Sequence, residues 1–187
     1  VLFIADEIQT GIARTGKMLA IDHEDIKADM IILGKAVSGG AYPVSAVLTN
    51  DEIMNVIKPG QHGSTYGGNP LAAAVATEAL QVVLDEKLAD NSERLGQIFR
   101  SEITKMTEEF PLFKSVRGKG LLNAILINDT EDSDTAWNFC VAMKDNGLLA
   151  KPTHGNIIRF APPLVITEEQ LHDCLAIIRK TAEEFKK

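Results

Sequence analysis

The sequence predicts an α/β protein in two parts, a layered α/β region followed by a smaller α+β region. In the first part, short apolar runs alternate with polar or glycine-containing segments, as in strands that are buried on both faces. A long Ala-rich helix follows these strands. Beyond that helix, strands and helices alternate and carry apolar faces of their own, so we expect two domains, residues 1–88 and 89–187.

The first part is predicted to contain three strands. Residues 1–5 (VLFIA) and 30–33 (MIIL) are apolar runs, and the segment between them is predicted to hold a loop and a short helix. A third strand, residues 45–49, follows a glycine turn. Asn69 and Pro70 are typical of a helix N-cap and first helical residue. They begin an apolar helix that we expect to be buried on more than one side.

The second part is predicted to mix strands with amphipathic helices. The helices are expected at 91–110, 135–146 and 167–185, and the strands at 121–127 and 157–161. Trp137, Phe139 and Met143 follow helical spacing, which places them in the expected core.

Composition excludes several classes of function. The net charge is −7 and the 19 basic residues are dispersed, which argues against binding to nucleic acid or to an anionic membrane surface. No apolar run approaches the roughly 20 residues that cross a bilayer, so we expect a soluble protein. Cys140 and Cys174 lie in helical patterns typical of buried free thiols, which favours a reducing compartment, the cytoplasm or, in a eukaryote, the mitochondrial matrix. The four histidines share no spacing typical of a metal site.

The chain begins inside an apolar strand pattern, without Met, a helix cap or a signal-peptide layout. We therefore expect it to be a fragment whose upstream part is missing.

An acidic and a basic residue follow the first two predicted strands. Asp6 ends the first strand, and Lys35 follows the second after one glycine. Ligands of open α/β sheets bind at the carboxyl ends of strands, so the pair marks a candidate site. Three interpretations compete: an Asp that caps a helix beside a solvated Lys, a nucleotide triphosphatase, and a pyridoxal phosphate site.

The triphosphatase interpretation depends on residues 11–17 (GIARTGK), which fit most of a phosphate loop. Such a loop needs Ser or Thr after its lysine to bind Mg²⁺, and here that residue is Met18. Pyridoxal phosphate chemistry instead needs one carboxylate at the ring nitrogen and one lysine at the aldehyde carbon. Asp6 and Lys35 suit these two roles.

Three strings then resemble the class III aminotransferases, a subgroup of the fold-type I pyridoxal phosphate enzymes: VLFIADEIQTGIARTGK, ILGKAVSGGAYPVSAVL and HGSTYGGNPLAAAVATEAL. The resemblance implies the end of a large domain with a mainly parallel sheet in α/β/α layers, then a small α+β domain. By resemblance, Asp6 pairs with the ring nitrogen, Gln9 contacts the ring hydroxyl and Lys35 is the catalytic lysine that holds the cofactor. Thr65 would donate to the cofactor phosphate of a neighbouring subunit, which implies a homodimer or larger assembly.

The strings RGKGLLNAIL, DNGLLAKPTHG and IIRFAPPLVIT resemble the ornithine aminotransferases more closely than the acetylornithine or 4-aminobutyrate enzymes. The resemblance implies transfer of the δ-amino group of L-ornithine to 2-oxoglutarate, which gives glutamate-5-semialdehyde and glutamate. Arg159 would bind a substrate carboxylate, because a planar guanidinium matches a carboxylate with two hydrogen bonds. A structural arginine at a strand end is the alternative.

Two other functions stay open. The amino donor can be N-acetylornithine or another ω-amino acid, or the chain can be a non-catalytic truncated homologue. In the resembled family the phosphate-binding loop, the aromatic that stacks on the cofactor ring and several substrate-binding residues lie upstream. We therefore expect this chain alone to lack aminotransferase activity.

Overall fold

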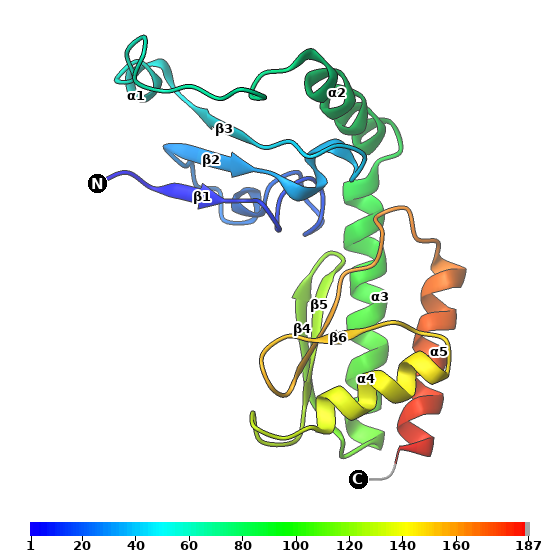
Figure 1. The fold of residues 1–187 in the computed structure, drawn as a ribbon. Coiled ribbons are helices and arrows are strands. Elements are labelled where there is room, and N and C mark those ends of the chain that lie inside the picture. Colours follow the sequence, from blue (N-terminus) through cyan, green and yellow to red (C-terminus); the bar gives the residue numbers. More distant parts are fainter. Residues whose placement is uncertain (186–187) are drawn as a thin grey trace. The chain divides into compact units, whose positions relative to one another are not determined.

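The computed structural model describes residues 1–185 (Figure 1) and forms two compact units, Val1–Ala89 and the chain from Asp90 onward. The division lies in the first turn of helix α3 (Leu88–Glu109), one residue beyond the expected boundary.

The first unit contains a mixed three-stranded sheet. Its strands are β1 (Ile4–Asp6), β2 (Met30–Leu33) and β3 (Ala46–Thr49), in that order across the sheet. β1 and β2 are parallel, and the chain between them includes the short 3-10 helix η1 (Ala20–His23). β3 runs antiparallel to β2. The predicted strands are therefore present, although β1 begins later than the apolar run suggests.

Helix α2 (Pro70–Asp85) begins as the sequence predicts. The Asn69 side chain accepts a hydrogen bond from the Ala72 backbone N–H at 2.8 Å, and Pro70 occupies the first helical turn. The expected burial on several sides is wrong for the chain described: α2 buries only Ala72 and Val83. The helix contacts the short helix η2 (Lys35–Ser38), and its other apolar positions are half-buried or exposed, among them Leu71, Val82 and Leu84. A further short helix, α1 (Asp51–Met54), follows β3.

The second unit has a four-stranded antiparallel sheet with helices α3, α4 (Thr135–Asp145) and α5 (Glu168–Glu184). The strand order is β4-β5-β7-β6, and the strands are β4 (Phe113–Lys119), β5 (Leu122–Ile127), β6 (Lys151–Pro152) and β7 (Ile157–Phe160). The helices and the strands β5 and β7 are those expected. β4 and β6 are additional.

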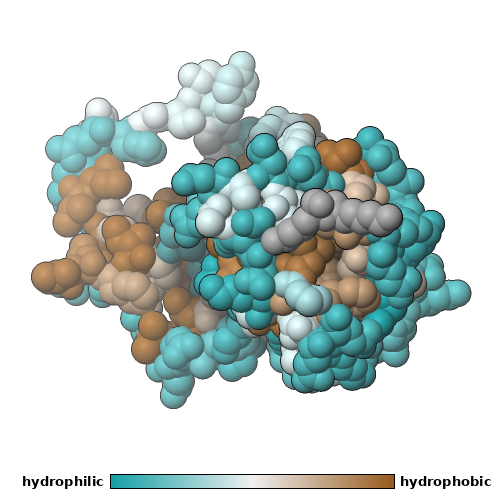
Figure 2. Space-filling model, turned by 90° about the horizontal axis from the view of Figure 1, so that it is seen from below, coloured by the Kyte–Doolittle hydropathy of each residue, from teal (hydrophilic) through white to brown (hydrophobic). Residues whose placement is uncertain are grey.

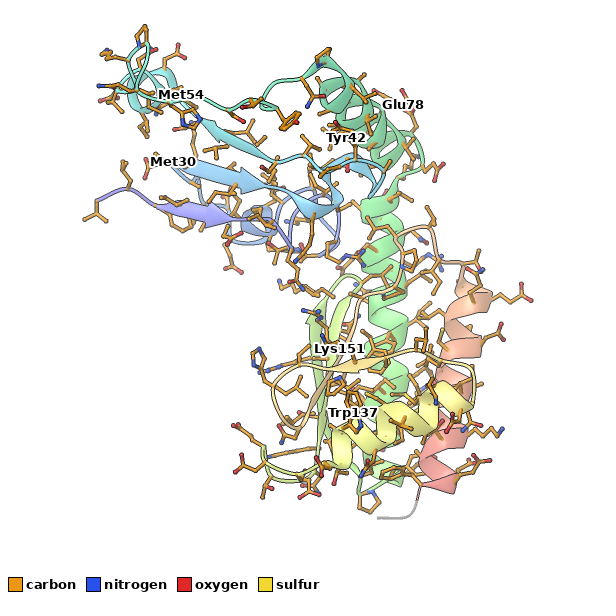
Figure 3. All side chains as sticks on the ribbon, in the orientation of Figure 1. Met30, Tyr42, Met54, Glu78, Trp137 and Lys151 are labelled. Atoms are coloured by element: carbon orange, nitrogen blue, oxygen red, sulfur yellow. The ribbon has the colours of Figure 1, made fainter. Side chains whose placement is uncertain are left out.

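One apolar core fills the second unit. It draws on α3, α4, α5 and the inward residues of the sheet, and it includes Leu95, Phe99, Ile103, Phe113, Ile125, Phe139, Met143, Ile158, Leu171 and Ile178. The ring of Phe139 stacks edge-on against Phe113 and Phe185, with centroid separations of 5.5 and 5.3 Å. The prediction of a core position for Trp137 is wrong, because this side chain lies on the outer face of α4 and is 59% exposed (Figure 3).

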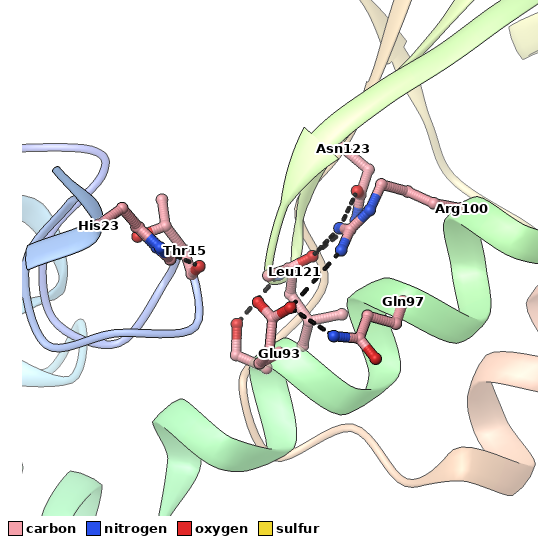
Figure 4. Close-up of polar contacts among 9 residues, drawn as sticks. Thr15, His23, Glu93, Gln97, Arg100, Leu121 and Asn123 are labelled. Atoms are coloured by element: carbon pink, nitrogen blue, oxygen red, sulfur yellow. Dashed lines mark hydrogen bonds and ion pairs between the residues drawn. The ribbon is translucent and has the colours of Figure 1, made fainter.

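Helix α3 is fastened to the turn between β4 and β5. The Arg100 guanidinium donates hydrogen bonds to the Gly120 carbonyl at 3.1 Å and to Asn123 Oδ1 at 3.0 Å, and Ser92 Oγ accepts from the Leu121 backbone N–H at 2.9 Å (Figure 4). A Cβ atom at Gly96 would overlap the Gly120 carbonyl. Helix and turn therefore touch through backbone atoms.

Across residues 1–185, every helix is too short or too polar to cross a membrane. In the same range, no three His, Cys, Asp or Glu side chains gather as metal ligands.

Candidate active site

The candidate site lies where the chain leaves two neighbouring parallel strands. Asp6 is the last residue of β1 and pairs in register with Ile32 of β2. Lys35 follows the end of β2 after Gly34. Because the strands are parallel, both residues emerge at the same edge of the sheet.

Lys35 has an accessible amine on a constrained backbone. Its Nζ donates a hydrogen bond to Gln9 Oε1 at 3.2 Å. Its φ angle is +50°, in the left-handed region that costs a non-glycine residue about 1–2 kcal/mol. Lys35 opens the short helix η2, in which Val37 and Ser38 are buried. The strand and the buried turn hold the backbone, while the side chain stays exposed.

The Asp6 carboxylate is anchored through one oxygen. Oδ1 accepts a hydrogen bond from the Ile8 backbone N–H at 3.1 Å, the geometry of an Asx turn. Oδ2 accepts no hydrogen bond from the described residues, and the side chain is exposed. One carboxylate oxygen is therefore available to a ligand that donates a hydrogen bond.

Thr65 makes no hydrogen bond to Lys35 within the residues that the structure describes. It is exposed, and within residues 1–185 it forms no hydrogen bond. Its loop has local order, because Ser64 Oγ accepts from the Gly67 backbone N–H at 2.9 Å.

Arg159 lies in the second unit, on the exposed side of β7. It pairs in register with Ala124 of β5 and Lys151 of β6. Its side chain forms no hydrogen bond or ion pair inside the range that the structure describes, so the guanidinium is open to an anion.

Arg159 lines a pocket of about 490 Å³ with mainly apolar walls, among them Phe99, Leu121, Leu148, Phe160, Pro162 and Ile166. Cys174 also lines this pocket, and burial, followed by the nearby charge of Asp173, raises the pKa of its thiol. Lys151 lines the pocket as well, and the combination of apolar walls and cationic side chains suits a small carboxylate with an aliphatic body.

Sequence reasoning assigned no role to Glu7. Only 2% of this residue is exposed, although it directly follows the exposed Asp6. In the sequence, Asp6 and Glu7 are adjacent acidic residues at the end of one strand. The fold of the segment that follows them leaves the Asp6 carboxylate exposed and buries that of Glu7.

Known proteins resemble this chain over almost its whole length. The family model described as aminotransferase class-III matches residues 1–182. The mitochondrial ornithine aminotransferase of Rattus norvegicus is 58% identical over 185 residues, which cover 99% of this chain and 42% of that protein. The chain thus spans about two fifths of the length of the curated relatives that it matches.

Two solved structures have the same fold. One is described as the acetylornithine aminotransferase of Elizabethkingia anophelis; it has a TM-score of 0.96 and 72% identity over 99% of this chain and 46% of that one. The ornithine aminotransferase of Toxoplasma gondii has a TM-score of 0.93 and 49% identity over 98% of this chain and 44% of that one. With the lysine and carboxylate placed at one sheet edge and the family model matched almost end to end, this chain belongs to the class III aminotransferases.

Proposed function

We propose that the full-length protein is a pyridoxal phosphate-dependent ornithine aminotransferase. It moves the δ-amino group of L-ornithine to 2-oxoglutarate and yields glutamate-5-semialdehyde and glutamate. The observation that carries the proposal is the contact of Lys35 Nζ with Gln9 Oε1, 3.2 Å apart, at the sheet edge that Asp6 shares.

The residues at this edge fit the cofactor. Pyridoxal phosphate presents an aldehyde, a ring hydroxyl and a ring nitrogen, which call for an amine, a polar partner and an acid. Lys35, Gln9 and Asp6 supply these three groups from two adjacent strand ends. The free oxygen of Asp6 and the exposed amine of Lys35 are both open to a ligand.

When bound, the cofactor supplies a ring that accepts electrons from the carbon that loses its proton. Asp6 would hold a proton on the ring nitrogen, which would keep the ring electron-poor. Gln9 would orient the ring through its hydroxyl. Lys35 would hold the cofactor between turnovers, and its amine, when free, would take the proton from the δ-carbon of ornithine.

Two further residues act on the substrate and the assembly. Arg159 binds a substrate carboxylate, which is supported by its place in the lining of the apolar pocket and by a guanidinium that has no partner within residues 1–185. Thr65 donates to the cofactor phosphate of a neighbouring subunit. The active unit is then a homodimer or larger, with each site completed by its partner.

The division of the chain supports a matching assignment of domains. Residues 1–88 form the C-terminal part of the cofactor-binding domain, and residues 89–187 form the small domain. We place the protein in a reducing compartment, the cytoplasm or, in a eukaryote, the mitochondrial matrix, which is supported by two cysteines that are free in the structure.

A second candidate donor is N-acetylornithine. The 72% identical structure from Elizabethkingia anophelis is described as an acetylornithine aminotransferase. The relatives named ornithine aminotransferase reach 58 and 60% identity. The two donors differ at the α-amino group, so a donor assay separates them.

The assay uses the purified full-length protein with 2-oxoglutarate and, in turn, L-ornithine and N-acetylornithine. We expect kcat/KM for ornithine to be higher by at least about tenfold, which corresponds to about 1.4 kcal/mol in the transition state. The variant Lys35→Ala should be inactive with either donor. Preference for N-acetylornithine would select the second candidate, and turnover by Lys35→Ala at the wild-type rate would overturn the aminotransferase assignment.

A further inference from the structure

Glu7 is a buried carboxylate that the proposed reaction does not use. Thr10 Oγ1 donates a hydrogen bond to Glu7 Oε2, and the Ile21 backbone N–H donates to Oε1 at 2.9 Å. The Glu7 backbone N–H donates to the Ile32 carbonyl at 3.0 Å and extends the pairing of β1 with β2. Both carboxylate oxygens are thus occupied by groups of the protein, which makes Glu7 unsuited to direct contact with a ligand.

The segment closed by this carboxylate, residues 7–21, has a strained backbone. Ile12 and Ala13 have φ angles of +55° and +65°, and both are buried. A Cβ atom at Gly11 would lie 2.8 Å from the Glu7 carbonyl. Left-handed backbone at residues other than glycine persists only where the surroundings hold it. The Glu7 side chain provides such a hold, since it ties the segment near its start and at its end.

The same segment carries Gln9. This residue lies between Glu7 and Thr10, whose side chains are bonded to each other, and its Oε1 accepts the hydrogen bond of Lys35 Nζ. The position of the Gln9 amide therefore depends on the turn that the Glu7 carboxylate closes.

We propose that Glu7 is a positioning residue. Its buried carboxylate fixes residues 7–21 so that the Gln9 amide meets both Lys35 and the ring of the cofactor. The inference rests on the proposed function, because the contact of Gln9 with the cofactor belongs to it.

Four variants of the full-length protein test this role. Glu7→Ala removes both side-chain bonds, and Thr10→Val removes one. Glu7→Gln keeps the shape: its oxygen can accept from the Ile21 N–H, and its amide can donate to the Thr10 hydroxyl. Thr181→Val is the matched control, because the Thr181 hydroxyl is also buried and bonded, to the Ile177 carbonyl and Asn146, on α5 of the second unit.

The first measurement is amide hydrogen exchange on the cofactor-free protein. We expect exchange within residues 8–13 to be at least about tenfold faster in Glu7→Ala, because local opening then costs less free energy. Glu7→Gln should match the wild type, and Thr10→Val should be intermediate. Thr181→Val should leave residues 8–13 unchanged.

The second measurement uses the protein loaded with pyridoxal phosphate. For Glu7→Ala we expect a shifted pH midpoint of the visible absorbance band of the lysine-bound cofactor. We also expect kcat to fall between about tenfold and a hundredfold, the scale of misplacing a group by about an ångström. KM for ornithine should change by less than about threefold. A purely structural role would lower the melting temperature and leave the pH midpoint in place.

Wild-type exchange, pH midpoint and kcat in Glu7→Ala would overturn the inference. If Glu7→Ala does not fold, Thr10→Val decides: an intermediate shift supports the role of Glu7, and wild-type values overturn it. Failure of the proposed function looks different, since the wild-type protein would then neither bind the cofactor at Lys35 nor transfer an amino group. In that case the exchange measurement decides whether Glu7 holds residues 7–21.

Discussion

Lys35 combines an exposed amine with a backbone that its neighbours constrain. The backbone has a left-handed φ angle of +50°, and the amine donates a hydrogen bond to Gln9. A catalytic lysine benefits from this combination, because its amine must move during the reaction while its backbone stays in place. The position after a strand identified Lys35 and Asp6 in the sequence. The roles of Gln9 and Thr65 came from the resemblance alone, since a lone amide or hydroxyl in a loop has no pattern of its own.

The buried thiol of Cys140 leads to a prediction at the residue scale. Burial raises the pKa of the Cys140 thiol to about 11. Since only the thiolate reacts, its reaction with a thiol reagent at pH 8 should be roughly a hundredfold slower than that of a free cysteine. Reagent uptake with and without urea, followed by peptide mapping, measures this rate. Fast labelling of Cys140 in the folded protein would contradict the prediction.

At the scale of elements, the sequence predicted those with strong periodicity or a cap and missed those without. The helix after Asn69 and the strand at Met30–Leu33 were found at their observed places. The sequence did not predict β4, because its outward residues are mostly polar. It did not predict β6, because two residues are too few to show the alternation of polar and apolar side chains that is typical of a strand. Trp137 follows helical spacing, but α4 turns that side chain outward, which the spacing alone does not determine.

The contact between α3 and the β4–β5 turn predicts a destabilising glycine substitution. In a helix interior, Gly96→Ala should gain about 1 kcal/mol from helix propensity. The new methyl group would overlap the Gly120 carbonyl, a backbone atom that cannot rotate away, and such overpacking costs typically about 1–3 kcal/mol. We expect a net loss in the free energy of unfolding, measured by urea denaturation. Gly63→Ala is the control, because nothing lies within 4 Å of a Cβ there; equal effects of the two substitutions would refute the clash.

A link between α3 and α5 predicts a pH-dependent part of the stability. The Arg179 guanidinium donates two hydrogen bonds to Glu109, one of them 3.1 Å long, and this pairing lowers the pKa of the Glu109 carboxyl. A lowered pKa in the folded state means that the stabilisation is present above the unfolded pKa and is lost as pH falls through the folded value.

Melting temperatures of the wild type and Glu109→Gln between pH 7 and acid measure this dependence. The difference should be present at neutral pH and vanish in acid. Glu108→Gln, at an exposed neighbouring position outside this pairing, is the control for the loss of one carboxylate. A difference between wild type and Glu109→Gln that stays constant with pH would argue against the pairing.

At the scale of the whole molecule, the two units differ in how well they are covered. The second unit encloses a continuous core. The first unit exposes apolar side chains on its sheet and on α2: Phe3, Ile4, Val47, Leu48, Leu71 and Leu84 are each more than 40% exposed. Figure 2 shows hydrophobic residues at the surface in a view from below. The sequence could not reveal this contrast, because an apolar strand has the same sequence pattern whether or not other helices or strands cover it.

This exposure leads to a prediction for residues 1–187 expressed alone. The chain spans about two fifths of its curated relatives, and its first unit lacks cover, so we expect no ornithine turnover from this segment. It should also bind an apolar fluorescent dye more strongly per mole than the full-length protein, because large exposed apolar patches bind such dyes. Turnover by the segment alone at a rate comparable to the full-length protein would contradict this expectation.

The most direct test of the account is the identity of the lysine that holds the cofactor. The full-length protein is loaded with pyridoxal phosphate, reduced with borohydride to make the bond permanent, digested and mapped by mass spectrometry. The account predicts that the label lies on Lys35 and that Lys35→Arg abolishes it while the protein still folds. Label on another lysine, or none in a folded wild-type protein, would contradict the assignment of the sheet edge at Asp6 and Lys35 as the active site.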